Sequence, residues 1–298
     1  MDAVEDGIGR QRLTPGGGPF NTARALARLG VTTGFLGHLS NDAFGRRLAS
    51  LLAADGANLA LASYGPEPTT LAVAELDGQG LAAYEFVVDG TSAPNLTLSM
   101  LPDKLAPDVR ALHVGTLGLV LEPMASTLTE LIRREGGQRL VLLDPNIRRA
   151  VLSNANEYRL RLEFLISRST IVKASEEDLA WLYPGLDYDA AAERVLESGA
   201  RLAIATVGVR GAYAATAEVR LKVDAPPTNV VDTIGAGDAF SAGLLAWLND
   251  HDLLRADLSL RPDELRASLE FACLVASLTC ARAGADPPTR AELRKLES

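Results

Sequence analysis

Short apolar runs alternate with amphipathic stretches over most of the chain from about residue 111 onward. Each run ends in polar or glycine residues, and the stretches between runs repeat apolar residues every three or four positions, which is the spacing of one helix face. The runs are ALHVGTLGL, RLVLLDPN, TIVKAS and RLAIATVG, and the amphipathic stretches lie near 123–135, 157–167, 175–182 and 188–199. This alternation is typical of βαβ units, so it predicts a mostly parallel sheet with helices on both faces.

Further helices and edge strands are predicted on either side of this region. GPFNTARALARLG and NDAFGRRLASLLAADG are amphipathic and end at Gly30 and Gly56, so both are expected to be helices, with a short strand, TTGFLG, between them. GAYAAT and VRLKVDA predict a meander at the sheet edge. Helices are also expected at 235–249, 262–283 and 289–296.

Residues 62–94 have a different pattern. TTLAVAEL and LAAYEFVV alternate apolar and polar positions and are joined by DGQG, which predicts a β-hairpin. We expect 62–94 and the segment at about 3–16 to form a small β-lid on a three-layer α/β/α sandwich, all within one domain spanning 1–298. In such open sheets ligands bind outside the carboxyl ends of the strands, so polar residues at those ends are the site candidates.

Composition excludes several classes of function. The net charge of −9 argues against general binding to nucleic acid or to anionic membranes, because both require a basic face. The two cysteines, Cys273 and Cys280, are too few for a disulfide framework and are expected to be reduced core thiols. The acidic start MDAVEDG and the lack of an eighteen-residue apolar run predict neither a signal peptide nor a membrane span, so a cytoplasmic location is expected.

The string VDTIGAGDAF carries the strongest chemical signal. Gly235, Ala236 and Gly237 lead directly into a helix, and their small side chains let backbone N–H groups approach an anion such as a transferring phosphoryl group. Asp238, in the first helical turn, is a candidate general base for an attacking hydroxyl. We expect the helix N-terminus to lower its pKa, which a loose phosphoryl-transfer transition state tolerates. The alternative is a tight turn followed by an ordinary helix N-terminal acid.

A second glycine-rich segment, PGGGPFNT, precedes the first predicted helix. Backbone amides at Gly17 and Gly18 and the side chain of Asn21 suit a polyhydroxylated ligand, whereas the alternative is a flexible loop before a helix. The chain has no GKS or GKT of a Walker A loop and no GxGxxG in its first βα unit. An NAD-dependent dehydrogenase therefore lacks its expected fingerprint.

The two segments together, in this order and over essentially the whole chain, resemble the two signature motifs of the ribokinase-like (PfkB-type) carbohydrate kinases. The chain is most similar to the fructokinase-like members, through GGGPFN, YEFVVDGTSA and SEED. The resemblance implies a ribokinase-like α/β/α fold with a β-lid over the sugar. It also implies Asp238 as the base, Gly235, Ala236 and Gly237 as the anion hole, and ATP, Mg²⁺ and in some members K⁺ as cofactors.

The resemblance extends to further site residues. The sugar contacts it implies are Asp2, Gly17, Gly18, Asn21, Phe86 and Arg148. The nucleotide contacts it implies are Lys173, Ser175, Thr206, Gly208, Gly211, Cys273 and Ser277. The metal contacts it implies are Asp178 for Mg²⁺, through water, and Asp232 with the Ile234 carbonyl for a monovalent cation. Ser175 and Asp178 stand where the family has Asn and Glu, so a helix N-cap with acids in its first turn is the alternative there. Turns at strand ends and a core helix are the alternatives for the other positions.

The start of the chain departs from the family. Members usually begin with an apolar strand, then Gly-Glu and, shortly after, the sugar-binding Asp, whereas here Asp2 falls near that Asp and the strand ahead of it is absent. We expect this to reflect a shortened start. Weak or absent activity is then expected, and it should be restored by roughly ten upstream residues, which are enough for one strand.

The leading hypothesis is ATP-dependent phosphorylation of a sugar hydroxyl, with fructose as the first candidate. 2-keto-3-deoxygluconate kinase is the closest competitor, followed by ribokinase or a nucleoside kinase. The competing hypothesis from another class is a non-catalytic sugar- or nucleotide-binding protein on a kinase scaffold. The expected partners are a small sugar and ATP, with no nucleic acid and no membrane, and the outer face of the lid is a candidate homodimer surface.

Overall fold

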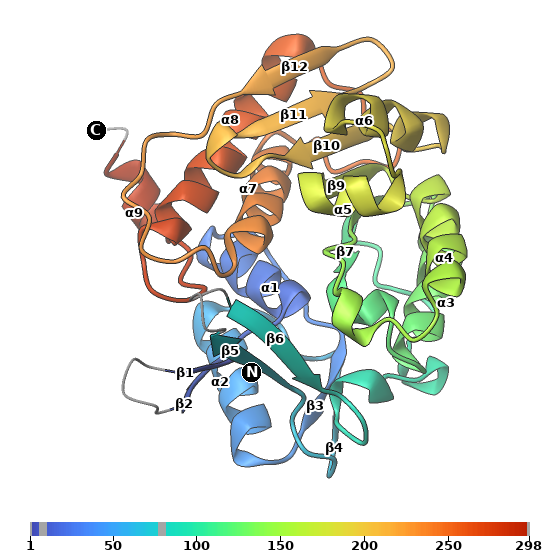
Figure 1. Cartoon of the computed structure of the whole chain (residues 1–298), viewed down its shortest axis with the longest axis vertical. Coiled ribbons are helices and arrows are strands. Elements are labelled where there is room, and N and C mark those ends of the chain that lie inside the picture. Colours follow the sequence, from blue (N-terminus) through green and yellow to red (C-terminus); the bar gives the residue numbers. More distant parts are fainter. Residues whose placement is uncertain (1, 6–10, 77–81, 297–298) are drawn as a thin grey trace.

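The computed structural model describes residues 2–5, 11–76 and 82–296, and within these a six-stranded sheet forms the centre of the molecule (Figure 1). The strand order is β12-β11-β10-β9-β8-β7. The strands are β7 (Ala111–Gly115), β8 (Leu140–Asp144), β9 (Ile171–Ser175), β10 (Leu202–Thr206), β11 (Ala212–Ala215) and β12 (Arg220–Val223). Strands β7 to β10 are parallel, and β11 and β12 are antiparallel, so the predicted parallel sheet with an edge meander is confirmed.

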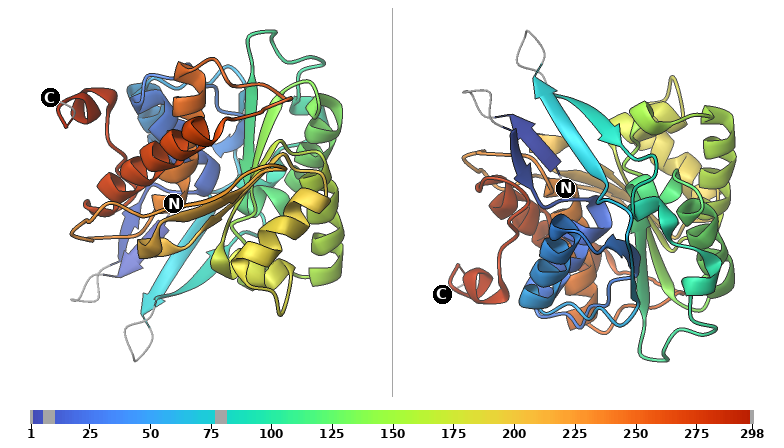
Figure 2. Two further views of the ribbon diagram at one scale, coloured as in Figure 1. Left: turned by 90° about the horizontal axis from the view of Figure 1, so that it is seen from above. Right: turned by 90° about the horizontal axis from the view of Figure 1, so that it is seen from below.

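Helices cover both faces of this sheet (Figure 2). One layer contains α1 (Gly18–Arg28), α7 (Ala236–Asp250) and α8 (Pro262–Cys280). The opposite layer contains α3 (Met124–Glu135), α4 (Ala155–Ser167), α5 (Glu176–Leu182) and α6 (Tyr188–Glu197). Helices α2 (Ala43–Asp55) and α9 (Arg290–Arg294) lie outside these layers (Figure 1). The predicted three-layer α/β/α sandwich is thereby confirmed, and α8 ends three residues earlier than expected.

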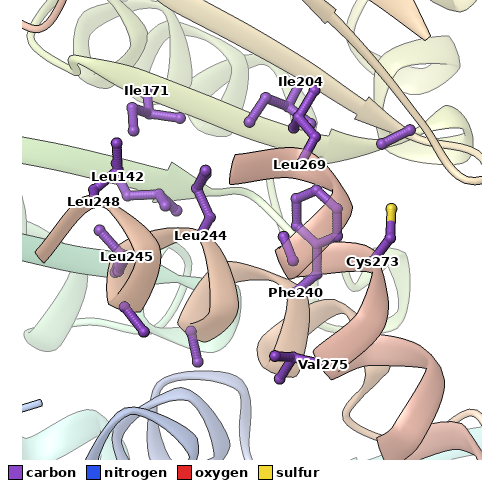
Figure 3. Packing of buried hydrophobic residues seen from close by; sticks show 14 of the residues in the cluster. Leu142, Ile171, Ile204, Phe240, Leu244, Leu245, Leu248, Leu269, Cys273 and Val275 are labelled. Atoms are coloured by element: carbon purple, nitrogen blue, oxygen red, sulfur yellow. The ribbon is translucent and has the colours of Figure 1, made fainter. Parts of the chain in front are cut away.

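Helix α7 is apolar on nearly all sides because it lies between the sheet and helices α1 and α8. Phe240 and Leu244 point towards Ile204 and Leu142 of the sheet (Figure 3). A side chain at Gly243 would come within 2.9 Å of Ala272 Cα, so this glycine lets α7 and α8 pack closely. The burial of α7 in the core holds its N-terminus in a defined place at the edge of the sheet.

A second, four-stranded sheet forms the lid, in the order β2-β1-β5-β6. Its strands are β1 (Asp2–Glu5), β2 (Gln11–Thr14), β5 (Leu71–Leu76) and β6 (Ala82–Val87). Strands β5 and β6 are antiparallel, so the predicted hairpin is confirmed, although most of its DGQG turn lies outside the described residues. Short 3₁₀ turns at 93–95 and 98–100 lead from the lid back to the central sheet.

One strand lies elsewhere than the pattern predicts. TTGFLG, at 32–37, was expected to be extended, but the strand is β3 (Gly37–Ser40), which pairs in parallel with β4 (Ala62–Gly65) in a separate two-stranded sheet. Residues 62–65 therefore do not join the lid sheet. A buried histidine hides this strand from a hydropathy pattern, because hydrogen bonds from His38 to Ser63 and Glu67 satisfy its ring nitrogens.

No helix within the described parts of the chain is long and apolar enough to cross a membrane.

Candidate active site

Helix α7 begins at a loop that requires glycine. Gly235 has φ 78°, and a side chain there would come within 2.6 Å of Ala285 Cβ. The Asp232 carboxylate fastens the loop by accepting hydrogen bonds from the N–H groups of Ile234, at 3.0 Å, and Gly284, at 2.8 Å. The loop therefore presents the unpaired N–H groups of the first turn of α7 towards a cavity, which is the geometry of an anion site.

Asp238 lies in that first turn and is buried against helix α1. It is 7% exposed, and Asn21 Nδ2 donates a 2.8 Å hydrogen bond to its Oδ2. A side chain at Gly18 would come within 3.3 Å of Asp238 Oδ1, so this glycine leaves space beside the carboxylate. The two glycine-rich segments, 217 residues apart at this hydrogen bond, meet at one carboxyl group.

The pKa of Asp238 is raised to about 6. Burial is the main cause, and the negative charge of Asp144 adds to it, while the hydrogen bond from Asn21 and the positive charges of Lys173 and Arg148 act in the opposite direction. The expectation of a lowered pKa is therefore wrong, because desolvation outweighs the helix N-terminus at this depth. A carboxylate with a pKa near 6 is ionised at neutral pH and is a stronger base than an ordinary aspartate.

A buried ion pair lies beneath the same loop. Lys173 Nζ donates a 2.8 Å hydrogen bond to Asp144 Oδ2, and both side chains are almost fully buried. A side chain at Gly237 would come within 2.8 Å of Lys173 Nζ, so the amine lies directly against the turn. Burial alone would lower the pKa of Lys173, but the charge and hydrogen bond of Asp144 and the charge of Asp238 give a net rise. Lys173 thus brings a fixed positive charge to the loop.

Two residues that the sequence analysis did not single out complete this side of the cavity. Thr116 and Asn146 follow β7 and β8, have φ angles of 57° and 40°, and are joined by a 3.3 Å hydrogen bond from Asn146 Nδ2 to Thr116 Oγ1. Left-handed backbone at non-glycine residues is uncommon and concentrates at functional sites. A side chain at Gly18 would overlap Thr116 Oγ1. Their position at the carboxyl ends of neighbouring strands was the signal available in the sequence.

The carboxylates near β8 and β9 suit a hydrated metal held mainly by phosphates. Asp178 forms a capping box with Ser175 and also accepts the Ile147 N–H at 2.8 Å, so the helix-cap alternative at this position is present. Asp144 Oδ1 is buried without a hydrogen-bond partner, which leaves one oxygen for a cation or its water. No cluster of three or more acidic, His or Cys residues occurs in the part of the chain that the structure describes. This donor set fits Mg²⁺, which usually keeps several waters in nucleotide sites.

All these groups border one large cavity of about 1420 Å³ at the carboxyl ends of the parallel strands. The predicted site residues along its wall are Gly17, Gly18, Asn21, Phe86, Arg148, Lys173, Ser175, Asp178, Thr206, Gly208, Ile234, Gly235, Gly237 and Asp238. Phe86 comes from lid strand β6, so the lid forms one wall. Glu177, which we had not singled out, is also on the wall and is exposed.

Other predicted residues lie away from the cavity wall. Cys273 is buried in the core beside Phe240, and Ser277 lies one turn further along α8 (Figure 3). Gly211 is packed against the backbone of Val223, where a side chain would overlap the carbonyl oxygen. Ala236 and Asp232 are also off the wall, although both shape the loop. Asp2 begins β1, but its side chain lies outside the described residues.

Comparison with known proteins places the chain in a family. The model of the pfkB family carbohydrate kinases matches residues 4–292. A fructokinase from Rhizobium leguminosarum bv. trifolii is 38% identical over 249 residues, covering 83% of this chain and 76% of the relative. A fructokinase from Klebsiella pneumoniae is 34% identical over 270 residues, covering 88% and 86%.

Solved structures agree with the sequence relatives. The fructokinase of Vibrio cholerae O395 with fructose, ADP and calcium bound has a TM-score of 0.87 and 27% identity, covering 99% of this chain and 94% of that one. The fructokinase of Xylella fastidiosa with bound ATP has a TM-score of 0.90 and 25% identity, with the same coverage. A match across nearly the whole length to a family model, a fold and named relatives leads to one conclusion: this chain belongs to the pfkB family of carbohydrate kinases.

Proposed function

We propose that this protein transfers the γ-phosphoryl group of ATP to a hydroxyl group of fructose, with Asp238 as the general base. The observation that carries the proposal is the meeting of Asp238, Asn21 and the Gly235–Gly237 turn at one cavity. The fructokinase relatives, and the solved fructokinases with fructose, ADP or ATP bound, support the choice of substrates.

In the proposed reaction, the sugar hydroxyl attacks the γ-phosphorus and the bond to the bridging oxygen of ADP breaks. The hydroxyl proton passes to Asp238, and the first-turn N–H groups of α7 stabilise the charge on the transferring group. Lys173 adds a positive charge beneath the loop, and the lid residue Phe86 helps to exclude water. Sequestering the reactants under a lid also aligns the hydroxyl with the phosphorus.

Asn21 is proposed to orient both the base and the sugar. Its Nδ2 donates to Asp238, while its Oδ1 is buried without a partner among the described residues, so that oxygen is free to accept a sugar hydroxyl. Gly17, Gly18 and Arg148 border the same side of the cavity. The donors and acceptors of this wall suit a polyol more than an apolar ligand.

The nucleotide is proposed to lie over the ends of β9 and β10, where Ser175, Thr206 and Gly208 border the cavity. Asp178, through water, and Asp144 would hold Mg²⁺, which neutralises phosphate charge when bound. The Asp232 loop and the Ile234 carbonyl are proposed for K⁺. Gly211, Cys273 and Ser277 remain predictions for the adenine end.

A sugar panel tests the function. With MgATP, we expect ADP formation with fructose at a higher kcat/KM than with glucose, ribose or 2-keto-3-deoxygluconate, measured by a coupled assay. A higher kcat/KM with 2-keto-3-deoxygluconate would assign the competing kinase. Sugar binding by calorimetry without ADP formation from any sugar would instead support a non-catalytic binding protein.

The pH dependence tests the role of Asn21. Since the base must be ionised, kcat/KM is expected to rise with pH through about 6 in the wild type. Replacing Asn21 with Ala removes a hydrogen bond that lowers the pKa of Asp238, so this rise should move to higher pH. The measurement is kcat/KM from pH 5 to 9.

Thr22→Val is the matched control, because the Thr22 hydroxyl contacts the backbone oxygen of Asp238 and not its carboxylate. Its pH profile should match that of the wild type. An unchanged profile in Asn21→Ala, with activity still measurable, would contradict the assignment of the base.

A further inference from the structure

Two strands with unpaired edges border the cavity below the candidate active site. Within the described residues, β7 pairs only with β8, and β3 pairs only with β4. The N–H of Leu140 bonds to the carbonyl of Arg110, and in a parallel ladder alternate residues bond to the same neighbour. The backbone N–H and C=O groups of Ala111, His113 and Gly115 therefore point away from β8.

The same reasoning applies to β3. The N–H of Asn41 bonds to the carbonyl of Gly65 on β4, so the backbone groups of His38 and Ser40 point to the other side. Residues of both β3 and β7 border the one cavity, and it also reaches Arg110 and Leu254 at the far end of β7. We call this part of the cavity, bordered by 37–39 of β3 and 110–115 of β7, the slot.

The walls of the slot are apolar on both sides. Leu96, Leu128 and Leu131 form one wall, in the layer of α3. Phe20, Leu26 and Leu245 form the other, in the layer of α1 and α7. A strand placed here would be buried on both faces, which requires a nearly continuous apolar sequence. It would also satisfy the backbone groups that β3 and β7 leave unpaired.

We propose that the slot receives one more β-strand, parallel to β7, from a segment of the same polypeptide that joins the chain ahead of Asp2. Strand β7 ends at Gly115, beside the residues that surround Asp238, so a parallel strand would also end there. Strand β1 begins at the same end, because Asp2 lies opposite Ala72 and Ala72 borders the cavity. An antiparallel strand would end at the far side, next to Arg110.

The added strand spans the five residues of β7, so it needs about five to seven residues at roughly 3.3 Å each. Its last residues would lie near Gly18 and Asp238 and would complete the wall of the site on that side. The inference depends on the cavity and the strand edges alone and does not rest on the proposed function.

The test compares three proteins by hydrogen exchange and thermal unfolding. They are the 298-residue chain, the chain extended by the ten residues encoded in frame upstream, and a chain with a Gly-Ser extension of equal length. With the encoded extension, the amides of Ala111, His113, Gly115 and Ser40 should exchange about 100-fold more slowly or less. Tm should rise by about 10 °C. The amides of Leu112 and Val114 already bond to β8, so they serve as an internal control with little change.

A second measurement covers an extended protein that does not fold: the same ten residues are added to the 298-residue chain as a synthetic peptide, and the same amides should become protected. Equal protection by the Gly-Ser extension would overturn the proposal, as would upstream codons without an apolar run. Protection that increases with protein concentration and accompanies dimers in native mass spectra would assign the slot to a second copy and would also overturn it.

Discussion

Replacing Asp238 with Asn is expected to lower kcat by a factor of about 10² to 10⁴, the usual contribution of a positioned base. The amide keeps the size and the hydrogen-bonding capacity of the carboxylate but cannot accept the hydroxyl proton. Binding of fructose and ATP should persist, because the loop that starts α7 depends on Gly235 and Asp232 and not on this side chain. Steady-state kinetics and calorimetry measure the two effects separately.

The same substitution should stabilise the fold at neutral pH. Because the pKa of Asp238 is raised to about 6, the folded state binds this proton more tightly than the unfolded state, and stability falls as pH rises from about 4 to 6. Two pKa units correspond to about 3 kcal/mol. Asp238→Asn should therefore exceed the wild type in free energy of unfolding by up to about 3 kcal/mol at pH 7, and the gain should vanish below pH 4.

Asp263→Asn is the matched control, because Asp263 is an acid in the first turn of α8 and is exposed. It should change neither kcat nor the pH dependence of stability appreciably. Urea unfolding of the three proteins at pH 4 and pH 7 gives the comparison. An Asp238→Asn enzyme with wild-type kcat would exclude Asp238 as the base.

Replacing Lys173 with Met is expected to cost about 3–5 kcal/mol of folding stability, because it leaves the Asp144 carboxylate buried without its partner. The substituted side chain has a similar length and can fill the same space, so a packing defect contributes little. The loss of positive charge should also raise the pKa of Asp238 further, since Lys173 lowers it in the wild type. Urea unfolding measures the stability, and the pH profile of kcat/KM measures the second effect.

Two further proteins separate the charge from the packing. Asp144→Asn combined with Lys173→Met removes both charges, and it should recover most of the lost stability. Lys222→Met removes an exposed partner of Asp189 by the same substitution and should cost less than about 1 kcal/mol. Equal losses in Lys173→Met and in the double variant would show that the buried pair does not account for the effect.

Much of the fold follows from local pattern. The alternation of apolar runs and amphipathic stretches is visible within windows of ten to twenty residues, so strands β7 to β10 and the helices between them could be predicted with nearly the observed bounds. The strand β3 could not, because His38 is polar by type and becomes acceptable in the interior only through Ser63 and Glu67. Those partners lie 25 and 29 residues away.

The sequence by itself determined the family resemblance, the parallel sandwich and the two glycine-rich segments, because their signals reside in neighbouring residues. Only the tertiary structure decided the pKa of Asp238, the pairing of Lys173 with Asp144, and the joining of Thr116 to Asn146. It also decided that β3 and β7 keep open edges on one cavity. Desolvation, charge separation and the space between two strands depend on distances through the folded molecule, and a linear pattern does not contain those distances.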